Sequence, residues 1–312
     1  MNDPLLVTSI AGAITAGTAV LIAATGEMLV EKVGVYNIGI EGIMLTGALA
    51  GFITGQKTDS LILALMAAIV AGALLAGVFA VAVIGLRADM IMAGFALVFL
   101  ATGVCAQIGR DYERDPAATR LPRWDVPGLS DIPYVGPALF KQMSLVYLAV
   151  LMPILMHLFL TRTRAGLNLR TIGESPVAAD AAGIAVNRTR MICILVGGAF
   201  AGLAGAFISL GVIGSWLPGV TAGQGWIAFG LVIFAGWRPL LLLLGAAVYG
   251  AFGTLGDVGQ AQGWNVPSEL FSALPYIGTL LVLVLLAWKR SRETGWSAWP
   301  SALGTPFSRS GV

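Results

Sequence analysis

The chain has 312 residues, of which 57% are hydrophobic, 11% are charged and 41 are glycine. Soluble globular proteins carry about 25% charged residues, so this composition excludes a soluble enzyme, a disordered chain and a coiled coil. The formal net charge of +2 is too small to indicate a nucleic-acid partner. The apolar residues form long unbroken runs, which predict an all-α, polytopic membrane protein rather than a β-barrel of short alternating segments.

A membrane-spanning helix needs about 20 consecutive apolar residues. Several runs in this chain approach that length, and we expect about nine spans, with eight to ten as the range. The seventh run is short for a span. The runs are Leu5–Thr25, Ile38–Thr54, Leu61–Leu86, Met90–Ile108, Leu145–Leu160, Met191–Ile213, Gly225–Trp237, Leu240–Leu255 and Leu270–Trp288.

The basic residues orient these spans. Residues 161–190 hold five arginines, and Lys289, Arg290 and Arg292 follow the last run. Because cytoplasmic loops are enriched in Lys and Arg, both segments are placed in the cytoplasm. Four runs lie between them, an even number as this placement requires. Counting back puts the N-terminus and residues 109–143 outside.

The polar segments divide the chain into one membrane domain and its loops. Residues 1–292 form the membrane domain, because no loop is long enough for a soluble catalytic domain. Residues 109–143 are rich in proline, so we expect an irregular extracytoplasmic loop there. Residues 161–190 form a cytoplasmic loop, and residues 293–312 a polar cytoplasmic tail without ordered structure.

Small residues recur four positions apart in two of the expected spans. Such ridges let helix backbones approach closely in a bilayer. The pattern predicts a tight bundle and does not say what the bundle does. The ridges are Gly47, Gly51 and Gly55, then Gly198 and Gly202, and Ala201 and Gly205.

Residues 26–42 place three carboxylates, a lysine and an asparagine between apolar runs. Charged groups inside a membrane are costly and face a cavity or a partner, and the glycines here favour a broken or re-entrant helix. Glu27 and Glu31 are spaced to share a helix face, and so are Asn37 and Glu41. One interpretation is that the segment lines a pathway; the other is an ordinary cytoplasmic loop with a capped helix start.

Residues 163–184 form a second distinctive segment. Ser175 is a good helix cap, Pro176 fits the first helical position and Gly183 fits the stop. Residues 177–182 between them are rich in alanine and are expected to form a short helix. The sequence leaves open whether this helix docks onto a partner or lies on the membrane surface.

Signals for catalysis are absent from the sequence. It contains no Gly-Lys dipeptide and therefore no Walker A loop for ATP hydrolysis. One histidine and two separated cysteines do not make a metal site. We expect no enzymatic activity, no metal and no cofactor in this chain.

Residues 26–48 resemble the signature of permease subunits of bacterial nucleoside-type ABC importers, whose larger family also serves ribose-type sugars and branched-chain amino acids. Residues 169–184 resemble the cytoplasmic coupling segment of that family, and residues 197–206 its following glycine-rich span. Shorter matches follow at residues 223–229, 238–239 and 275–276. Two departures are Ser175, where asparagine is common, and residues 236–239, where the family more often has Arg before Trp and Asn after it.

The resemblance implies an importer in the bacterial cytoplasmic (inner) membrane. Its partners would be an ABC ATPase subunit, a second, paralogous permease and an extracytoplasmic substrate-binding protein that residues 109–143 help to receive. The short helix would sit in a groove of the ATPase and transmit its closure to the spans. The coupling residues that the resemblance implies are Arg170, Gly173, Glu174, Ser175, Pro176, Ala178, Ala179, Ala182 and Gly183.

A nucleoside pathway needs aromatic rings for the base and hydrogen-bonding groups for the ribose. The candidates are Asn37, Glu41, Phe95, Trp226 and Phe229, with helix-interface anchoring as the alternative for each aromatic. Purine or pyrimidine nucleosides are the favoured substrates, and a simple sugar of the ribose or galactose type is the alternative. A stand-alone secondary transporter, or a membrane enzyme or scaffold, has less support in the sequence.

Overall fold

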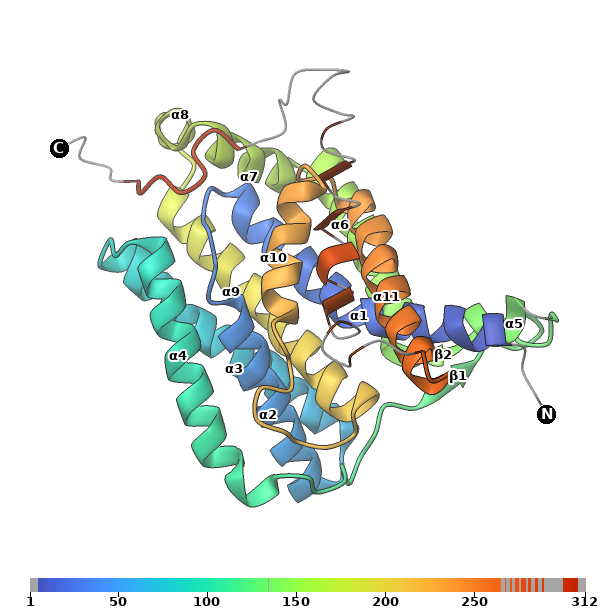
Figure 1. The fold of residues 1–312 in the computed structure, drawn as a ribbon. Helices are drawn as coiled ribbons and strands as arrows, with labels where there is room; N and C mark the ends of the chain where they lie inside the picture. Colours follow the sequence, from blue (N-terminus) through green and yellow to red (C-terminus); the bar gives the residue numbers. More distant parts are fainter. Residues whose placement is uncertain are drawn as a thin grey trace.

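The computed structural model describes residues 5–133, 135–264 and 300–307, together with short stretches between 267 and 288. The described chain is a bundle of helices with one small antiparallel ladder in a loop, as Figure 1 shows. The fold prediction of an all-α membrane bundle is therefore confirmed. The elements are α1 (Leu5–Lys32), α2 (Ile40–Thr58), α3 (Leu61–Ala80), η1 (Val81–Gly85), α4 (Met90–Gly109), η2 (Arg110–Tyr112), β1 (Arg123–Asp125), α5 (Val135–Leu139), β2 (Lys141–Met143), α6 (Ser144–Arg162), α7 (Arg164–Glu174), α8 (Pro176–Ala181), α9 (Val186–Ala206), η3 (Phe207–Val212), α10 (Gln224–Phe234) and α11 (Pro239–Ala261).

Six helices of the described chain are long and apolar enough to cross a membrane, so the expected count of about nine is not supported. They make the chain a multi-pass membrane protein. Two of the nine expected runs do not form separate spans, and the ninth, Leu270–Trp288, lies partly outside the described residues. The six are Val7–Lys32, Leu61–Gly85, Met90–Tyr112, Ser144–Arg162, Val186–Val212 and Pro239–Ala261.

Two of the expected runs form helices that do not qualify as membrane spans. The run expected at residues 38–54 forms α2, which has 19 residues and is largely buried by other helices. A helix that faces protein rather than lipid can carry glycine and polar residues, which is why α2 is not among the six. The run at residues 225–237 forms α10, whose 11 residues rise about 16 Å at 1.5 Å per residue, about half of a bilayer core.

Close packing of α2, α3 and α9 forms the centre of the bundle. Gly47 of α2 faces the backbone of Gly202 on α9, and Gly205 of α9 faces the carbonyl oxygen of Met44. A Cβ atom at either glycine would overlap a backbone atom of the opposite helix. The predicted ridge residues at these positions therefore serve helix approach.

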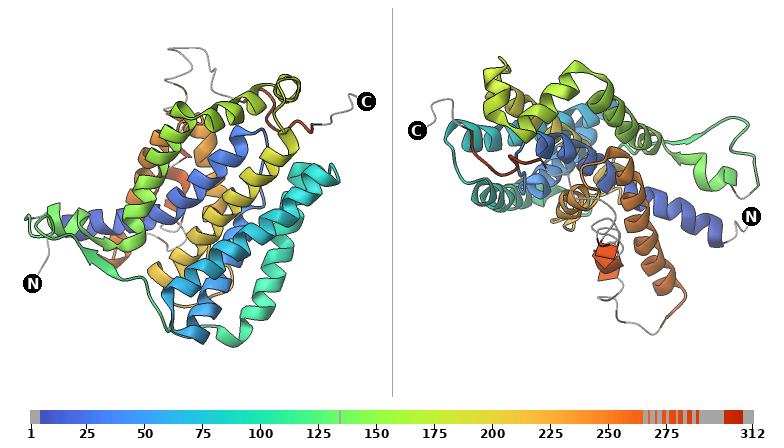
Figure 2. Two further views of the ribbon diagram at one scale, coloured as in Figure 1. Left: turned by 180° about the vertical axis from the view of Figure 1, so that it is seen from behind. Right: turned by 90° about the horizontal axis from the view of Figure 1, so that it is seen from above.

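The two ends of the bundle differ in character. In Figure 1, α7 and α8 lie at one end together with residues 300–307, and the connection that follows α4 lies at the other. Figure 2 shows the N-terminal part of α1 projecting from the side of the bundle next to α5 and the β1–β2 ladder. The loop 109–143 is irregular as expected, but Arg123–Asp125 pairs with Lys141–Met143, which the proline-rich sequence did not indicate.

Candidate functional site

The helix predicted from Ser175, Pro176 and Gly183 is present as α8. The Ser175 hydroxyl accepts a hydrogen bond from the Ala178 amide at 3.3 Å, and Pro176 occupies the first helical position. Gly183 follows the helix with a φ of +83°, in the left-handed region that ends helices. The preceding residues form a further helix, α7, capped by the Thr163 hydroxyl, where no helix was predicted.

The residues predicted for coupling divide into a buried and an exposed set. Gly173 and Ala179 are buried and hold α7 and α8 against the bundle, while Ser175 and Pro176 are partly buried. The remaining coupling residues are exposed, and so is the neighbouring Val177, whose side chain is 71% exposed. The exposed coupling residues are Arg170, Glu174, Ala178, Ala182 and Gly183.

The tail was expected to lack ordered structure, and this is wrong for residues 300–307, which we call the C-terminal strap. The Ala302 amide donates to the Gly173 carbonyl at 2.8 Å, and the Ser301 hydroxyl donates to the Glu174 carboxylate at 2.7 Å. The Gly304 amide donates to the Gly34 carbonyl at 3.1 Å. The strap thus joins the end of α7 to the connection between α1 and α2.

Arg190 of α9 binds the strap through its side chain. Its side chain is only 2% exposed. One guanidinium nitrogen donates to the Val33 carbonyl at 2.9 Å and another to the Thr305 carbonyl at 3.2 Å. One buried side chain therefore binds both the α1–α2 connection and the strap.

The predicted helix break in residues 26–42 is confirmed: α1 ends at Lys32 and α2 begins at Ile40. Glu27 of α1 closes the connection, because its carboxylate accepts bonds from the Asn37 backbone amide and side-chain amide, both at 3.2 Å. The expected shared helix face of Asn37 and Glu41 is wrong, since Asn37 lies before the start of α2. In Figure 1 the connection runs from the α7–α8 end into the bundle.

The Glu41 carboxylate accepts more hydrogen bonds than the other carboxylates of residues 26–42. It accepts from the Thr221 hydroxyl at 2.6 Å, the Gly223 amide at 2.8 Å and the Gly225 amide at 2.7 Å. The two amides belong to the N-terminus of α10, which carries a positive partial charge that favours an anion. The first turn of α2 is thereby fastened to the start of the half-length helix α10.

Glu31 links α1 to the turn between α10 and α11. One of its oxygens accepts from the Trp237 indole nitrogen at 2.7 Å. Both side chains are buried. The three carboxylates of residues 26–42 thus bind three different segments, and each contact is internal to the chain.

The predicted pathway aromatics are only partly brought together. Phe229 of α10 packs near Tyr36 of the α1–α2 connection, with ring centroids 6.0 Å apart. Phe95 of α4 and Trp226 of α10 are 43% and 46% exposed, and in the described part of the chain neither makes a ring contact. Partial burial, and after it the charge of Glu31, raises the pKa of Tyr36, so its phenol stays a neutral hydrogen-bonding group.

A sequence model of the family described as branched-chain amino acid transport system / permease component matches residues 9–285. The chain belongs to this permease family. The resemblance drawn from the sequence motifs is therefore confirmed, and the motifs at residues 26–48 and 169–184 lie within the matched region. No solved structure matches the chain.

Several relatives of this permease are named as ABC transporter permease proteins. It is 36% identical over 275 residues to a putative glucose ABC transporter permease protein of Haloferax volcanii, covering 87% of this chain and 82% of the relative. It is 33% identical over 284 residues to a nucleoside ABC transporter permease protein of Lactococcus lactis, covering 87% and 90%. A guanosine ABC transporter permease protein of Bacillus subtilis is 32% identical over 276 residues, covering 84% and 86%.

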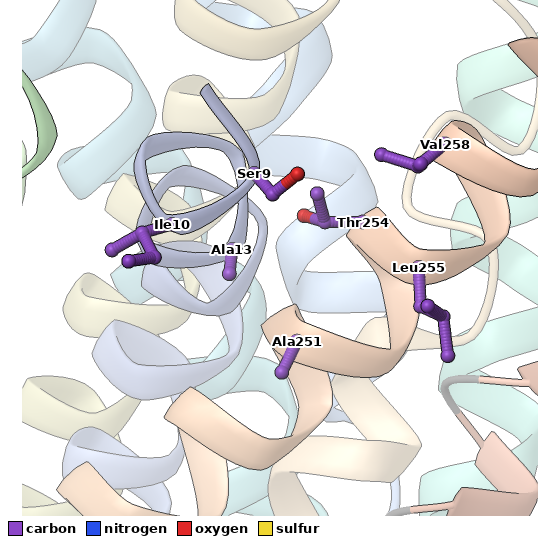
Figure 3. A pocket seen from close by; sticks show the side chains of 7 residues that line it. All are labelled: Ser9, Ile10, Ala13, Ala251, Thr254, Leu255 and Val258. Carbon is purple, nitrogen blue, oxygen red and sulfur yellow. The ribbon is translucent and has the colours of Figure 1, made fainter. Parts of the chain in front are cut away.

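The permease also carries an apolar hollow of about 360 Å³ between α1 and α11. Figure 3 shows the side chains that line it, with the hydroxyls of Ser9 and Thr254 pointing toward one another. None of the predicted pathway residues lines this hollow.

Sequence reasoning missed several residues that organise the permease. The carboxylates of residues 26–42 accept hydrogen bonds from Thr221, Gly223 and Trp237. The Arg190 guanidinium donates a hydrogen bond to the strap. Among these, Arg190 had a signal in the sequence, because it directly precedes the apolar run that begins at Met191. Nothing in the sequence indicated that its partners would be backbone carbonyls from both ends of the chain.

Proposed function

We propose that this chain is one permease subunit of an ABC importer for nucleosides, working in the bacterial cytoplasmic membrane and driven by ATP hydrolysis on a partner subunit. A second, paralogous permease would complete the membrane part, and an extracytoplasmic binding protein would deliver substrate to residues 109–143. The observation that carries the proposal is the continuous set of contacts from α8 to α10.

These contacts offer a route for coupling. The exposed alanine surface of α8 suits docking into a groove of an ATPase, because its small side chains allow close approach. Movement of α7 would pass to the strap through Gly173 and Glu174, and from the strap to the α1–α2 connection through Gly34. The α1–α2 connection leads directly into the first turn of α2, where Glu41 binds the start of α10.

The substrate assignment rests on the resemblance of residues 26–48 to the nucleoside branch and on relatives named for nucleoside and guanosine transport. A relative named for glucose favours the sugar alternative. Phe95, Trp226 and Phe229 remain the candidates for stacking on a base. For Asn37 and Glu41 we now propose a positioning role, because their side chains are engaged with Glu27 and with α10.

Substitution of an exposed alanine on α8 tests the coupling assignment. Ala178→Trp adds bulk to the docking surface, and Ala88→Trp, at an exposed position in the α3–α4 connection, is the matched control. We expect Ala178→Trp to abolish co-purification of the ATPase subunit and ATP-driven uptake while membrane insertion stays normal. Full ATPase binding by this variant would contradict the assignment.

Competition experiments test the substrate. Uptake of labelled guanosine by cells that express the complete importer should be blocked by excess unlabelled nucleosides and unaffected by equal concentrations of ribose or glucose. The opposite pattern would replace the nucleoside assignment by the sugar alternative. Ion-driven uptake by the purified chain alone in liposomes would exclude an ABC importer altogether.

A further inference from the structure

A pocket of about 440 Å³ lies where the ends of α1, α6, α7 and α11 meet, on the same end of the bundle as α8. This volume is within the range of roughly 300–1,000 Å³ that is usual for ligand pockets. Three cationic side chains from three parts of the chain line it, namely Lys32, Arg170 and Arg238. His157 of α6 also faces it.

The three cations are not neutralised within the described residues. The ion pair recorded there joins Lys141 to Asp125 on the opposite side of the molecule, and neither Lys32, Arg170 nor Arg238 makes a side-chain hydrogen bond in that part of the chain. Two acids lie near Lys32, namely Glu31 and Glu174, and they accept hydrogen bonds from Trp237 and Ser301. They offset part of the positive charge, but neither of them lines the pocket. The lining therefore holds three cationic side chains and no carboxylate.

The remaining lining is apolar. Leu160 of α6 and Leu240 and Leu241 of α11 complete the wall. Further along the faces of α6 and α11 that line the pocket, Val150, Ile154 and Leu244 are exposed. The cationic mouth thus continues into an apolar surface along two neighbouring spans.

We propose that this pocket binds the phosphate headgroup of an anionic phospholipid, whose acyl chains lie along α6 and α11. Basic pockets between spans at the cytoplasmic surface suit anionic headgroups, since each Lys or Arg there attracts the anionic leaflet. A free phosphate would satisfy the same cations but would leave the apolar surface of Val150, Ile154 and Leu244 without a role, which is why the proposal commits to a lipid. It does not depend on the transported substrate.

Native mass spectrometry of the delipidated full-length chain, titrated with phosphatidylglycerol or phosphatidylcholine, tests the proposal. We expect phosphatidylglycerol to bind at least tenfold more tightly. Removing one cation with Arg238→Gln should weaken it about fivefold, and adding Lys32→Gln should remove the preference. Arg238 begins α11 without a side-chain cap, so the single variant leaves the helix start intact.

Arg87→Gln is the matched control, because Arg87 is exposed in the α3–α4 connection and does not line the pocket. It should bind phosphatidylglycerol like the unaltered chain. Equal lipid binding by Arg238→Gln and the unaltered chain would overturn the proposal. So would complete displacement of the lipid by millimolar inorganic phosphate, or variants that lose the ATPase subunit while they keep the lipid.

Discussion

Replacement of Glu41 by glutamine tests whether the start of α10 is held by a carboxylate. Glu41 is 8% exposed and accepts bonds with both oxygens. Glutamine keeps the size of the side chain but turns one acceptor into a donor. That amide would then face either the Thr221–Gly223 pair or the Gly225 amide, and at least one donor would lose its partner.

The expected cost follows from these contacts. A hydrogen bond to a charged group contributes about 1.5–3 kcal/mol, and the charge at a helix N-terminus adds roughly 0.3–1 kcal/mol. Together they predict a loss of about 2–4 kcal/mol for Glu41→Gln. Glu41→Asp should lose part of this, because its carboxylate is one methylene shorter and reaches fewer donors.

Equilibrium unfolding of the purified full-length chain, followed by tryptophan fluorescence, measures this loss. Glu113→Gln is the control, since Glu113 is exposed in the loop 109–143 and its charge should contribute little. Hydrogen exchange of the α10 amides adds a local readout, and we expect the first turn to exchange faster in Glu41→Gln. A variant as stable as the unaltered chain, with unchanged exchange in α10, would refute the reasoning.

Three further substitutions probe other contacts. Gly205→Ala places a Cβ against the backbone of α2 and should cost about 1–3 kcal/mol in thermal unfolding, whereas Gly103→Ala, with open space around it, should be neutral or stabilising. A double-mutant cycle of Trp237→Phe and Glu31→Ala should give a coupling energy of about 1.5–3 kcal/mol; a value near zero would contradict the buried bond. Ser175→Ala should cost about 1 kcal/mol and speed hydrogen exchange in α8, and unchanged exchange would show that the cap is dispensable.

Local chemistry explains which features the sequence could predict. The break between α1 and α2, the cap of α8 at Ser175 and the glycine ridges all depend on residues close together in the chain. Glycine and cap signals act over three or four positions, so they can be recognised without knowledge of the fold. The expected boundaries of α8 were correct to within one residue.

The hydrogen-bond partners of Glu31 and Glu41 could not be predicted from neighbouring residues, because the fold brings them together. Glu41 meets an amide 184 positions away, and Glu31 meets an indole 206 positions away. The number of spans was overestimated because α2 and α10 are apolar enough to be counted as spans. In the fold, α2 is buried among other helices and α10 is too short to cross a bilayer. The ordered strap was missed because its partners, the Gly173 and Gly34 carbonyls and the side chains of Glu174 and Arg190, are distant from it in the chain.

The C-terminal strap also has a consequence for shortened forms of this chain. A stop codon directly before residue 300 would leave intact the six membrane-competent helices of the described residues, and the shortened protein should still enter the membrane. It would nevertheless lack the peptide that joins Gly173 to Gly34 and would leave the Arg190 guanidinium facing an empty groove. Such alleles should behave as transport-deficient proteins of normal abundance, and an affinity tag for purification is better placed away from this end.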